Sequence, residues 1–227
     1  YRTPPFESTP NVTWTREIGR VLTATIDGGA AAVGFDIIFP ASIEQSEIPF
    51  ENGTLGERVR GFDRDFLRAL ATAARSGKVV LGQVQHSDAP ILPTQGQRIA
   101  VDQQRNIRAL NVFSDADGVI RRVTQSFSID GANIPSLSFE LAARGQQVQP
   151  DIAADGSVSV AGYRPPAVEP NTLTLNFEGG ADDIPTYSLG DLRACVEKGD
   201  AEFFRRQFEG RIVLIGTVLD VEDRKIT

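Results

Sequence analysis

The sequence has 227 residues, 41% hydrophobic and 23% charged, with a formal net charge of −7 and a pI near 4.9. A chain of this length and composition is expected to fold as one globular domain, and it needs neither a disulfide nor a metal for its stability. The acidic balance argues against nucleic acid as a partner, because phosphate backbones are bound by basic surfaces. No stretch approaches the ~20 apolar residues of a membrane span, and a start at Tyr1 rather than Met indicates a piece of a longer protein.

Three helix-then-strand units are predicted along the chain. The first joins an amphipathic helix over residues 14–29 to the apolar run AAAVGFDIIFP. The second joins a helix over residues 62–76 to KVVLGQ, and the third joins DAEFFRRQFEG to RIVLIGT. Unbroken apolar strands are typical of parallel sheets that are covered on both faces, so three parallel neighbours in one sheet are expected.

The segments between these units have a different character. Residues 41–61 are polar and rich in Glu, and they are interpreted as a long exposed loop that could act as a lid. The run NVFSDADGVIRRVTQSFSID predicts an antiparallel hairpin about DADG, and SVSVAGYRP and TLTLNF predict further strands. The segment IPSLSFELAARG predicts a helix with Pro135 near its first turn and Gly145 at its end. The predicted fold class is α/β, with a mixed, mostly parallel central sheet, helices on both faces and antiparallel hairpin strands.

Asp36 is the most informative polar residue, because it interrupts the apolar run VGFDIIF. An ionised carboxylate in a strand core is costly unless it is paired, so a loop hydrogen bond or an arginine partner is one interpretation. The second interpretation is that Asp36 binds a ligand, because open α/β sheets bind ligands at the carboxyl ends of their strands. A ligand pocket is therefore hypothesised near Asp36, Phe39 and Gln83.

The DADG segment is a second candidate site. A calcium loop would need further oxygen ligands where Val119 stands, so a hairpin turn with Asp117 and Gly118 at positive φ is the favoured interpretation. The remaining hypothesis is that Arg121 or Arg122 points into a pocket and binds an anion.

His86 and Cys195 are the remaining residues with reactive side chains. His86 follows the second predicted strand and is a candidate pH sensor, with a solvated loop histidine as the alternative. Cys195 is the only cysteine, and it is interpreted as a small buried residue of a helix. The sequence carries no nucleophile elbow and no phosphate-binding glycine motif, so it requires no cofactor.

Six blocks of the sequence together resemble a known family, the CHASE sensory domains of the second type. In chain order they are WTRE, VGFDIIF, DRDFLRAL before KVVLG, DADGVIRR, IPSLSFELA, and FEGRIVLIGT with VEDRKIT. The resemblance extends from Trp14 to Thr227, but the WTRE block lacks the family's prolines, and the acidic strand that normally precedes it is missing. It therefore implies one domain over residues 1–227 without its N-terminal strand. The ending EDRKIT resembles that of adenylate cyclase members.

The resemblance implies a sensor on the extracytoplasmic, periplasmic face of the membrane, within an integral membrane protein. Its partners would be an unknown small-molecule or environmental signal and a cytoplasmic output domain of the same chain, joined through transmembrane helices. That output would be a class III adenylate cyclase or a kinase, and a homodimer is possible. The signal would act by population shift.

Two alternatives to a sensor remain open. One is a ligand-free structural or dimerisation module of a receptor, and the other is a soluble hydrolase or transferase that uses Asp36 and His86. The predicted ligand-binding residues are Asp36, Phe39, Gln83, His86, Arg121 and Arg122.

Overall fold

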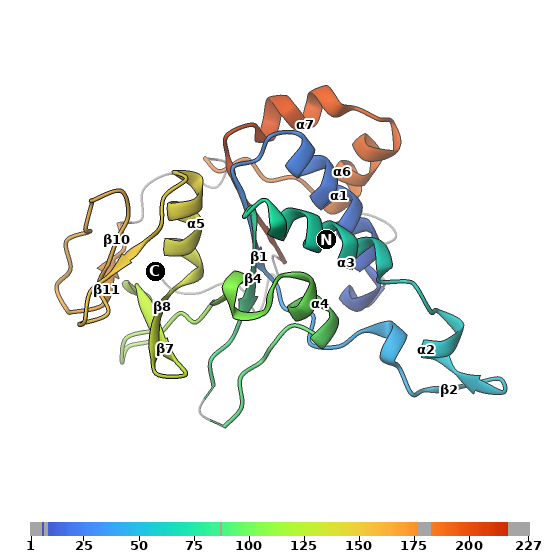
Figure 1. The fold of residues 1–227 in the computed structure, drawn as a ribbon, viewed down its shortest axis with the longest axis horizontal. Coiled ribbons are helices and arrows are strands. Elements are labelled where there is room, and N and C mark those ends of the chain that lie inside the picture. The colour runs from blue at the N-terminus through green and yellow to red at the C-terminus, as the bar shows by residue number, and fades with distance from the viewer. Residues whose placement is uncertain (1–5, 7–8, 87, 177–182, 218–227) are drawn as a thin grey trace.

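A computed structural model describes residues 6, 9–86, 88–176 and 183–217 of the chain. A four-stranded parallel sheet in the order β12-β1-β4-β5 forms the centre of the molecule (Figure 1). Its strands are β1 (Ala32–Asp36), β4 (Val79–Gln83), β5 (Ile107–Ala109) and β12 (Ile212–Gly216). The three strands expected to be parallel neighbours are adjacent, which confirms that prediction. β5 adds a fourth strand, which is too short to show a period in the sequence.

Helices cover both faces of this sheet, as the unbroken apolar strands predicted. Helices α1 (Thr15–Asp27) and α3 (Arg64–Arg75) lie on one face, and α5 (Leu137–Gly145) lies on the other (Figure 1). Helices α6 (Leu189–Glu197) and α7 (Ala201–Phe208) pack beside α1.

The side chains of β1 show how the two faces are divided. Val33 and Phe35 belong to the large cluster under α1 and α3, whereas Ala32 contacts the smaller cluster under α5. A side chain at Gly34 would place its Cβ only 2.4 Å from Leu141 Cδ1, so this position needs a glycine for α5 to pack closely.

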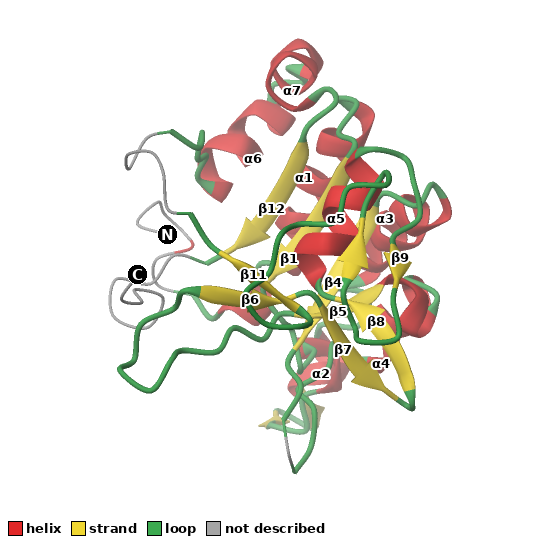
Figure 2. Ribbon diagram, turned by 90° about the vertical axis from the view of Figure 1, so that its left-hand side faces the viewer, coloured by secondary structure: helices red, strands yellow, loops and turns green. Residues whose placement is uncertain are grey.

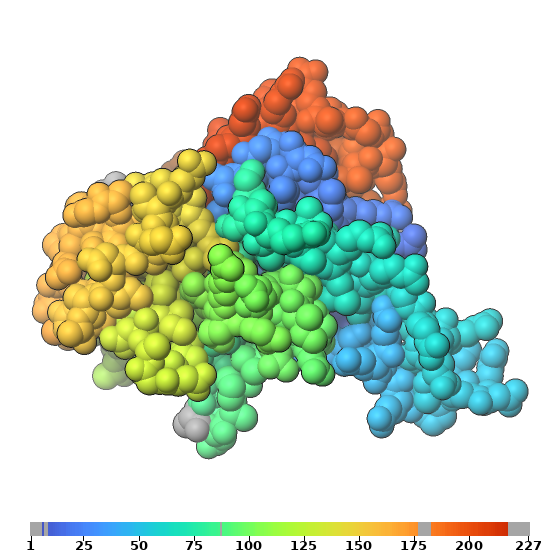
Figure 3. Space-filling model, viewed as in Figure 1, coloured from blue at the N-terminus to red at the C-terminus, as the bar shows by residue number. Residues whose placement is uncertain are grey.

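Residues 42–61, called the arm here, project from the body of the molecule (Figures 1 and 3). This segment is exposed as predicted, but it contains short regular elements rather than only a loop. They are the 3-10 turn η3 (Ile43–Gln45), the hairpin strands β2 (Pro49–Phe50) and β3 (Gly53–Thr54), and the helical turn α2 (Leu55–Arg58). Asp63 fixes the base of the arm, because its carboxylate accepts hydrogen bonds from Thr15 Oγ1 at 2.6 Å and from Ser42.

Three antiparallel strand pairs lie beyond α5. They are β6 (Arg122–Thr124) with β11 (Thr172–Thr174), β7 (Ser126–Ile129) with β8 (Ala132–Pro135), and β9 (Asp151–Ile152) with β10 (Val158–Ser159). The described part of the chain also contains η2 (Asn11–Thr13), α4 (Gln95–Ala100) and η4 (Gln103–Asn106). Among the described residues, no helix combines the length and the apolar character that crossing a bilayer requires.

The predicted hairpin about DADG is wrong. The turn exists, with Asp115 N–H donating to the Val119 carbonyl at 2.8 Å, but the strand after it pairs with β11 instead of with the residues before the turn. Gly118 has a φ of 81°, whereas Asp117 is not in the left-handed region. A turn residue can fix where the chain reverses, but packing decides which strand it pairs with.

Pro135 lies next to the first turn of α5, as predicted. It ends β8, and Ser136 is the N-cap of α5, so the proline lies just outside the helix; Gly145 ends α5 as expected. Pro135 pairs with Ser126 in the β7–β8 ladder, so it belongs to the strand, and the helix can begin only after it.

Candidate functional site

The carboxyl ends of the four parallel strands meet at one edge of the sheet. Asp36 ends β1 and is in register with Gly216, which ends β12, and Gln83 ends β4 in register with Ala109 of β5. A Cβ at Gly216 would lie 3.3 Å from the Asp36 Cβ, so the glycine leaves space beside this carboxylate. The sheet thus brings Asp36 and Gln83 to the same edge, where open α/β sheets bind ligands.

Asp36 does not lie in the strand core, so the expectation of a buried carboxylate inside β1 is wrong. The four residues before it in β1 are buried, but Asp36 itself is exposed. The desolvation cost of a buried carboxylate therefore does not arise, because the strand ends where its carboxylate reaches solvent. The side chain instead lines a cavity of about 780 Å³.

This cavity, called the β12 slot here, follows strand β12. Every residue from Gly210 to Thr217 lines it, together with Asp36 at one end. Most of the other walls are apolar and come from three helices: Ile18 and Val21 of α1, Leu189 and Leu192 of α6, and Ala142 and Gly145 of α5. Among the polar groups in the wall, Tyr187 donates a hydrogen bond to Gln207 Oε1 at 2.7 Å. The volume lies within the range of small-molecule pockets, roughly 300–1,000 Å³.

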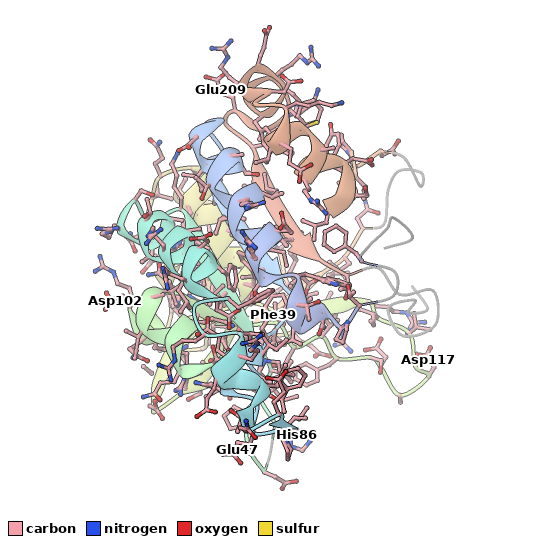
Figure 4. The ribbon with its side chains drawn as sticks, turned by 90° about the vertical axis from the view of Figure 1, so that its right-hand side faces the viewer. Phe39, Glu47, His86, Asp102, Asp117 and Glu209 are labelled. Carbon is pink, nitrogen blue, oxygen red and sulfur yellow. The ribbon has the colours of Figure 1, made fainter. Side chains whose placement is uncertain are left out.

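Phe39 and Gln83 face the interior and are not among the residues that line the β12 slot. Phe39, which is labelled in Figure 4, is 3% exposed, and its ring lies 5.9 Å from that of Phe66 in a T-shaped contact. Gln83 is 1% exposed, and within the described part of the chain its Oε1 accepts no hydrogen bond. A buried acceptor without a partner costs about 1–3 kcal/mol, which makes Gln83 the least satisfied polar group at this edge.

His86 lies in the loop after β4 with its side chain 57% exposed, and its Nδ1 is 3.9 Å from Asp88 Oδ2. Figure 4 shows His86 away from Asp117, and Figure 1 shows that the loop after β4 lies apart from the arm. His86 is not among the described residues that line the β12 slot with Asp36. The geometry therefore does not assemble the Asp36 and His86 pair that a hydrolase would use.

Arg121 and Arg122 are held by carboxylates. Arg121 bonds Asp117 at 2.9 Å and Asp115 at 3.0 Å, and Arg122 bonds Asp115 at 2.7 Å and also pairs with Glu169. The hydrogen bond from Arg121 lowers the pKa of Asp117 to about 2, and the one from Arg122 lowers the pKa of Asp115. Each guanidinium already has anionic partners, so an external anion would have to compete with them.

An ionic triad that the sequence did not suggest lies beneath α5. The Glu140 carboxylate accepts hydrogen bonds from Arg108 Nε at 2.8 Å and from Arg144 Nε at 2.7 Å. Arg144 also donates to the carbonyls of Gly77 and Val79 at 2.9 Å each. The spacing of Glu140 and Arg144 was readable as a helical ion pair, but the contact of Arg108 with α5 depends on tertiary structure.

The described residues do not form a metal site or a site for thiol chemistry. No group of three or more His, Cys, Asp or Glu side chains there could hold a metal ion. Cys195 is partly buried in α6 and packs against the large hydrophobic cluster, in line with its interpretation as a packing residue.

Comparison with known proteins places the chain in a family. No curated protein and no solved structure matches it. The model of the CHASE2 domain family matches residues 7–227, which is nearly the whole chain. CHASE2 domains are extracytoplasmic sensors and are not catalytic. The resemblance inferred from six sequence blocks is therefore confirmed, and the chain belongs to the CHASE2 domain family.

Proposed function

We propose that this chain is the signal-receiving domain of a membrane-bound bacterial signal transducer whose output is a class III adenylate cyclase. Membership of the CHASE2 family, matched over residues 7–227, is the observation that carries the sensory part. The cyclase part is supported by the likeness of the VEDRKIT ending to cyclase members, and this ending lies outside the described residues. A kinase is the alternative output.

The signal binds, in this proposal, at the carboxyl edge of the parallel sheet around Asp36. Three features support this location: the exposed carboxylate at the end of β1, the adjoining β12 slot, and the buried Gln83 Oε1 at the end of the neighbouring strand. A signal that prefers one conformation moves the output only as far as its differential affinity allows. A shift from 1:99 to 99:1 requires about 10⁴-fold.

Substitution of Asp36 by Asn in the intact protein tests this location. Because the side chain is exposed, we expect Asp36→Asn to keep the fold and to change cyclase output in membranes by about 5-fold or more, the lower end of usual coupling energies. Asp88→Asn, in the loop after β4, is the matched control and should leave the output unchanged. If Asp36→Asn leaves both thermal stability and cyclase output unchanged, the site does not lie here.

A ligand panel tests the sensory function without reference to Asp36. We expect at least one metabolite or ion to raise the melting temperature of the 227-residue chain, because a ligand that binds only the folded state stabilises it. Dimers in solution with no such rise across the panel would instead indicate a structural module.

A further inference from the structure

The arm ends in an exposed tip, residues 47–51, that stands clear of the body of the molecule (Figure 3). Ile48 is 62% exposed and Phe50 is 44% exposed, so the tip presents two large apolar side chains to solvent. Glu47 and Glu51 flank them, and neither carboxylate forms an ion pair or a hydrogen bond with another described residue. The tip therefore combines apolar surface with two carboxylates that have no partner in the described part of the chain.

Hydrogen bonds within the arm hold this tip in place. Leu55 N–H donates to the Ile48 carbonyl at 2.9 Å, which connects the tip to helix α2. Thr54 caps α2 and forms a capping box with Glu57, and Asp63 anchors the base of the arm to α1. A segment that is ordered before it binds loses little conformational entropy on binding, so the arm is suited to docking.

A surface of complementary chemistry lies where α3 packs against α4. We call it the α4 patch, and it consists of Leu67, Arg68, Arg98 and Ile99. Ile99 is 61% exposed. Leu67 of α3 lies beside Gly96 of α4, since a Cβ at that glycine would meet Leu67 side-chain atoms at 3.5–3.6 Å. The patch thus presents apolar side chains beside two arginines.

Arg98 is the arginine of the α4 patch that lacks a carboxylate. Arg68 pairs with Asp65 at 3.5 Å, whereas Arg98 forms no ion pair in the described part of the chain. Its Nε is enclosed by protein atoms and donates no hydrogen bond to a described residue. A guanidinium that is partly removed from water without a counterion favours an approaching carboxylate, because charge-assisted hydrogen bonds then replace the lost hydration.

We propose that the arm tip of one copy of this chain docks on the α4 patch of a second copy, and that the second copy returns the same contact. Ile48 and Phe50 cover the apolar side chains of the patch, and the carboxylates beside them pair with Arg98 of the other copy. Each copy contributes the same two surfaces, so the contact is isologous and closes as a two-fold symmetric dimer.

A second copy is the partner that the positions and charges of the two surfaces favour. The arm and α4 lie at the same end of the molecule, and the arm extends away from α4 (Figure 1). A two-fold rotation about an axis between them exchanges the two surfaces, so each tip faces the other copy's patch. The net charge of −7 repels two copies in general, so association needs a contact at which opposite charges meet. The inference goes beyond the sensory function proposed above and does not depend on it.

Sedimentation velocity of the 227-residue chain tests the proposal. We expect a reversible dimer in the micromolar range that weakens as salt rises, because exposed charge pairs are screened. The double variant Glu47→Arg, Glu51→Arg should weaken the dimer about 10-fold or more, equivalent to ~1.4 kcal/mol. Its matched control is Glu202→Arg, Glu209→Arg, which makes the same change of charge at exposed positions and should dimerise like wild type. Figure 4 shows Glu209 at the opposite end of the molecule from Glu47.

A charge swap tests the pairing itself. Arg98→Glu alone should weaken the dimer about 10-fold. Added to the Glu47→Arg, Glu51→Arg chain, it should strengthen that chain's dimer by about 3-fold or more, because opposite charges then meet again. Ile99→Ser changes an exposed side chain of the same patch, and it should also weaken the dimer even where Arg98→Glu lowers the melting temperature.

A wild-type chain that remains monomeric well above micromolar concentration would overturn the proposal, even where another protein binds the arm. A dimer that the arm variants do not weaken, or a charge swap without any gain, would overturn it as well. Neither surface includes Asp36, so the cyclase response of Asp36→Asn and the ligand panel can fail or succeed independently of this dimer.

Discussion

Glu140 is held by two arginines in a nearly closed site. Its side chain is 7% exposed, against 11% for Arg108 and 13% for Arg144, so the charges of this triad are largely removed from water. Burial lowers the pKa of Arg108, and the interaction with Glu140 opposes that shift. Removing one partner from such a group leaves a buried charge without compensation, which is what makes these residues sensitive to substitution.

We expect Glu140→Gln to lower the free energy of unfolding by about 3–5 kcal/mol, because two guanidiniums would then remain buried without their carboxylate. Urea denaturation measures this change. Glu197→Gln is the control, since Glu197 makes an ion pair of the same i,i+4 spacing with Arg193 on the surface, where such pairs contribute ~0–1 kcal/mol. Equal losses in the two variants would show that the triad has no special role.

Asp117 offers a pH-dependent test at the exposed ionic cluster. Its pKa falls from the ordinary 3.8 to about 2, mainly through the hydrogen bond from Arg121. A lowered folded-state pKa means that the stabilising contribution is complete above pH ~4 and is lost as the pH falls toward the folded pKa. A carboxyl-carbon NMR titration should therefore give a midpoint for Asp117 near 2.

The matched variants for this titration are Arg121→Gln and Arg68→Gln. Arg121→Gln should raise the Asp117 pKa toward its ordinary value, whereas Arg68→Gln, which removes an exposed ion pair with Asp65, should not change it. A midpoint that stays low in Arg121→Gln would assign the shift to another group.

At the scale of elements, helices α1 and α3 approach each other closely. A Cβ at Gly19 would come 2.8 Å from the Cα of Phe66, so the two helix backbones pack too closely there for any side chain. The glycine of α1 thus acts through packing against another element and not through unusual φ, which explains why it is tolerated inside a helix.

We expect Gly19→Ala to cost about 1–3 kcal/mol, the usual range for overpacking, since backbone atoms would have to move. Gly96→Ala in α4 is the control: its Cβ would meet only Leu67 side-chain atoms at 3.5–3.6 Å, an ordinary contact. That variant should be neutral or more stable by up to ~1 kcal/mol, because Ala favours a helix over Gly. Thermal unfolding of both variants decides the matter, and similar melting temperatures would contradict the close approach.

Local sequence patterns predicted most of the elements but not how the shorter ones pair. The amphipathic periods of α1 and α3 and the apolar runs of β1, β4 and β12 were long enough to recognise. β5 has only three residues, and nothing local distinguishes it from a loop. The hairpin prediction failed because the partner of β6 lies far along the chain in β11, and such pairing is set by tertiary contacts.

At the scale of the whole molecule, the sequence predicted the edge of the candidate site but not its interior. Parallel strands place Asp36 and Gln83 at one end of the sheet, and this followed from the apolar runs alone. Phe39 was taken for a pocket residue, yet the chain after β1 returns it to the core against Phe66. The β12 slot could not be predicted from the sequence. Its walls come from α1, α5 and α6, and the periodicity of a helix does not show how it is placed relative to other helices.

The pairing of β1 with β12 joins the beginning of the chain to its end. Ala32 lies in register with Ile212, so a ribosome must complete almost the whole domain before this ladder can form. Closing so long a loop is entropically costly, and folds dominated by such contacts mature slowly. Until β12 has been synthesised, the apolar flank of β1 stays open to wrong partners, and at this stage we expect the incomplete chain to be most prone to aggregation.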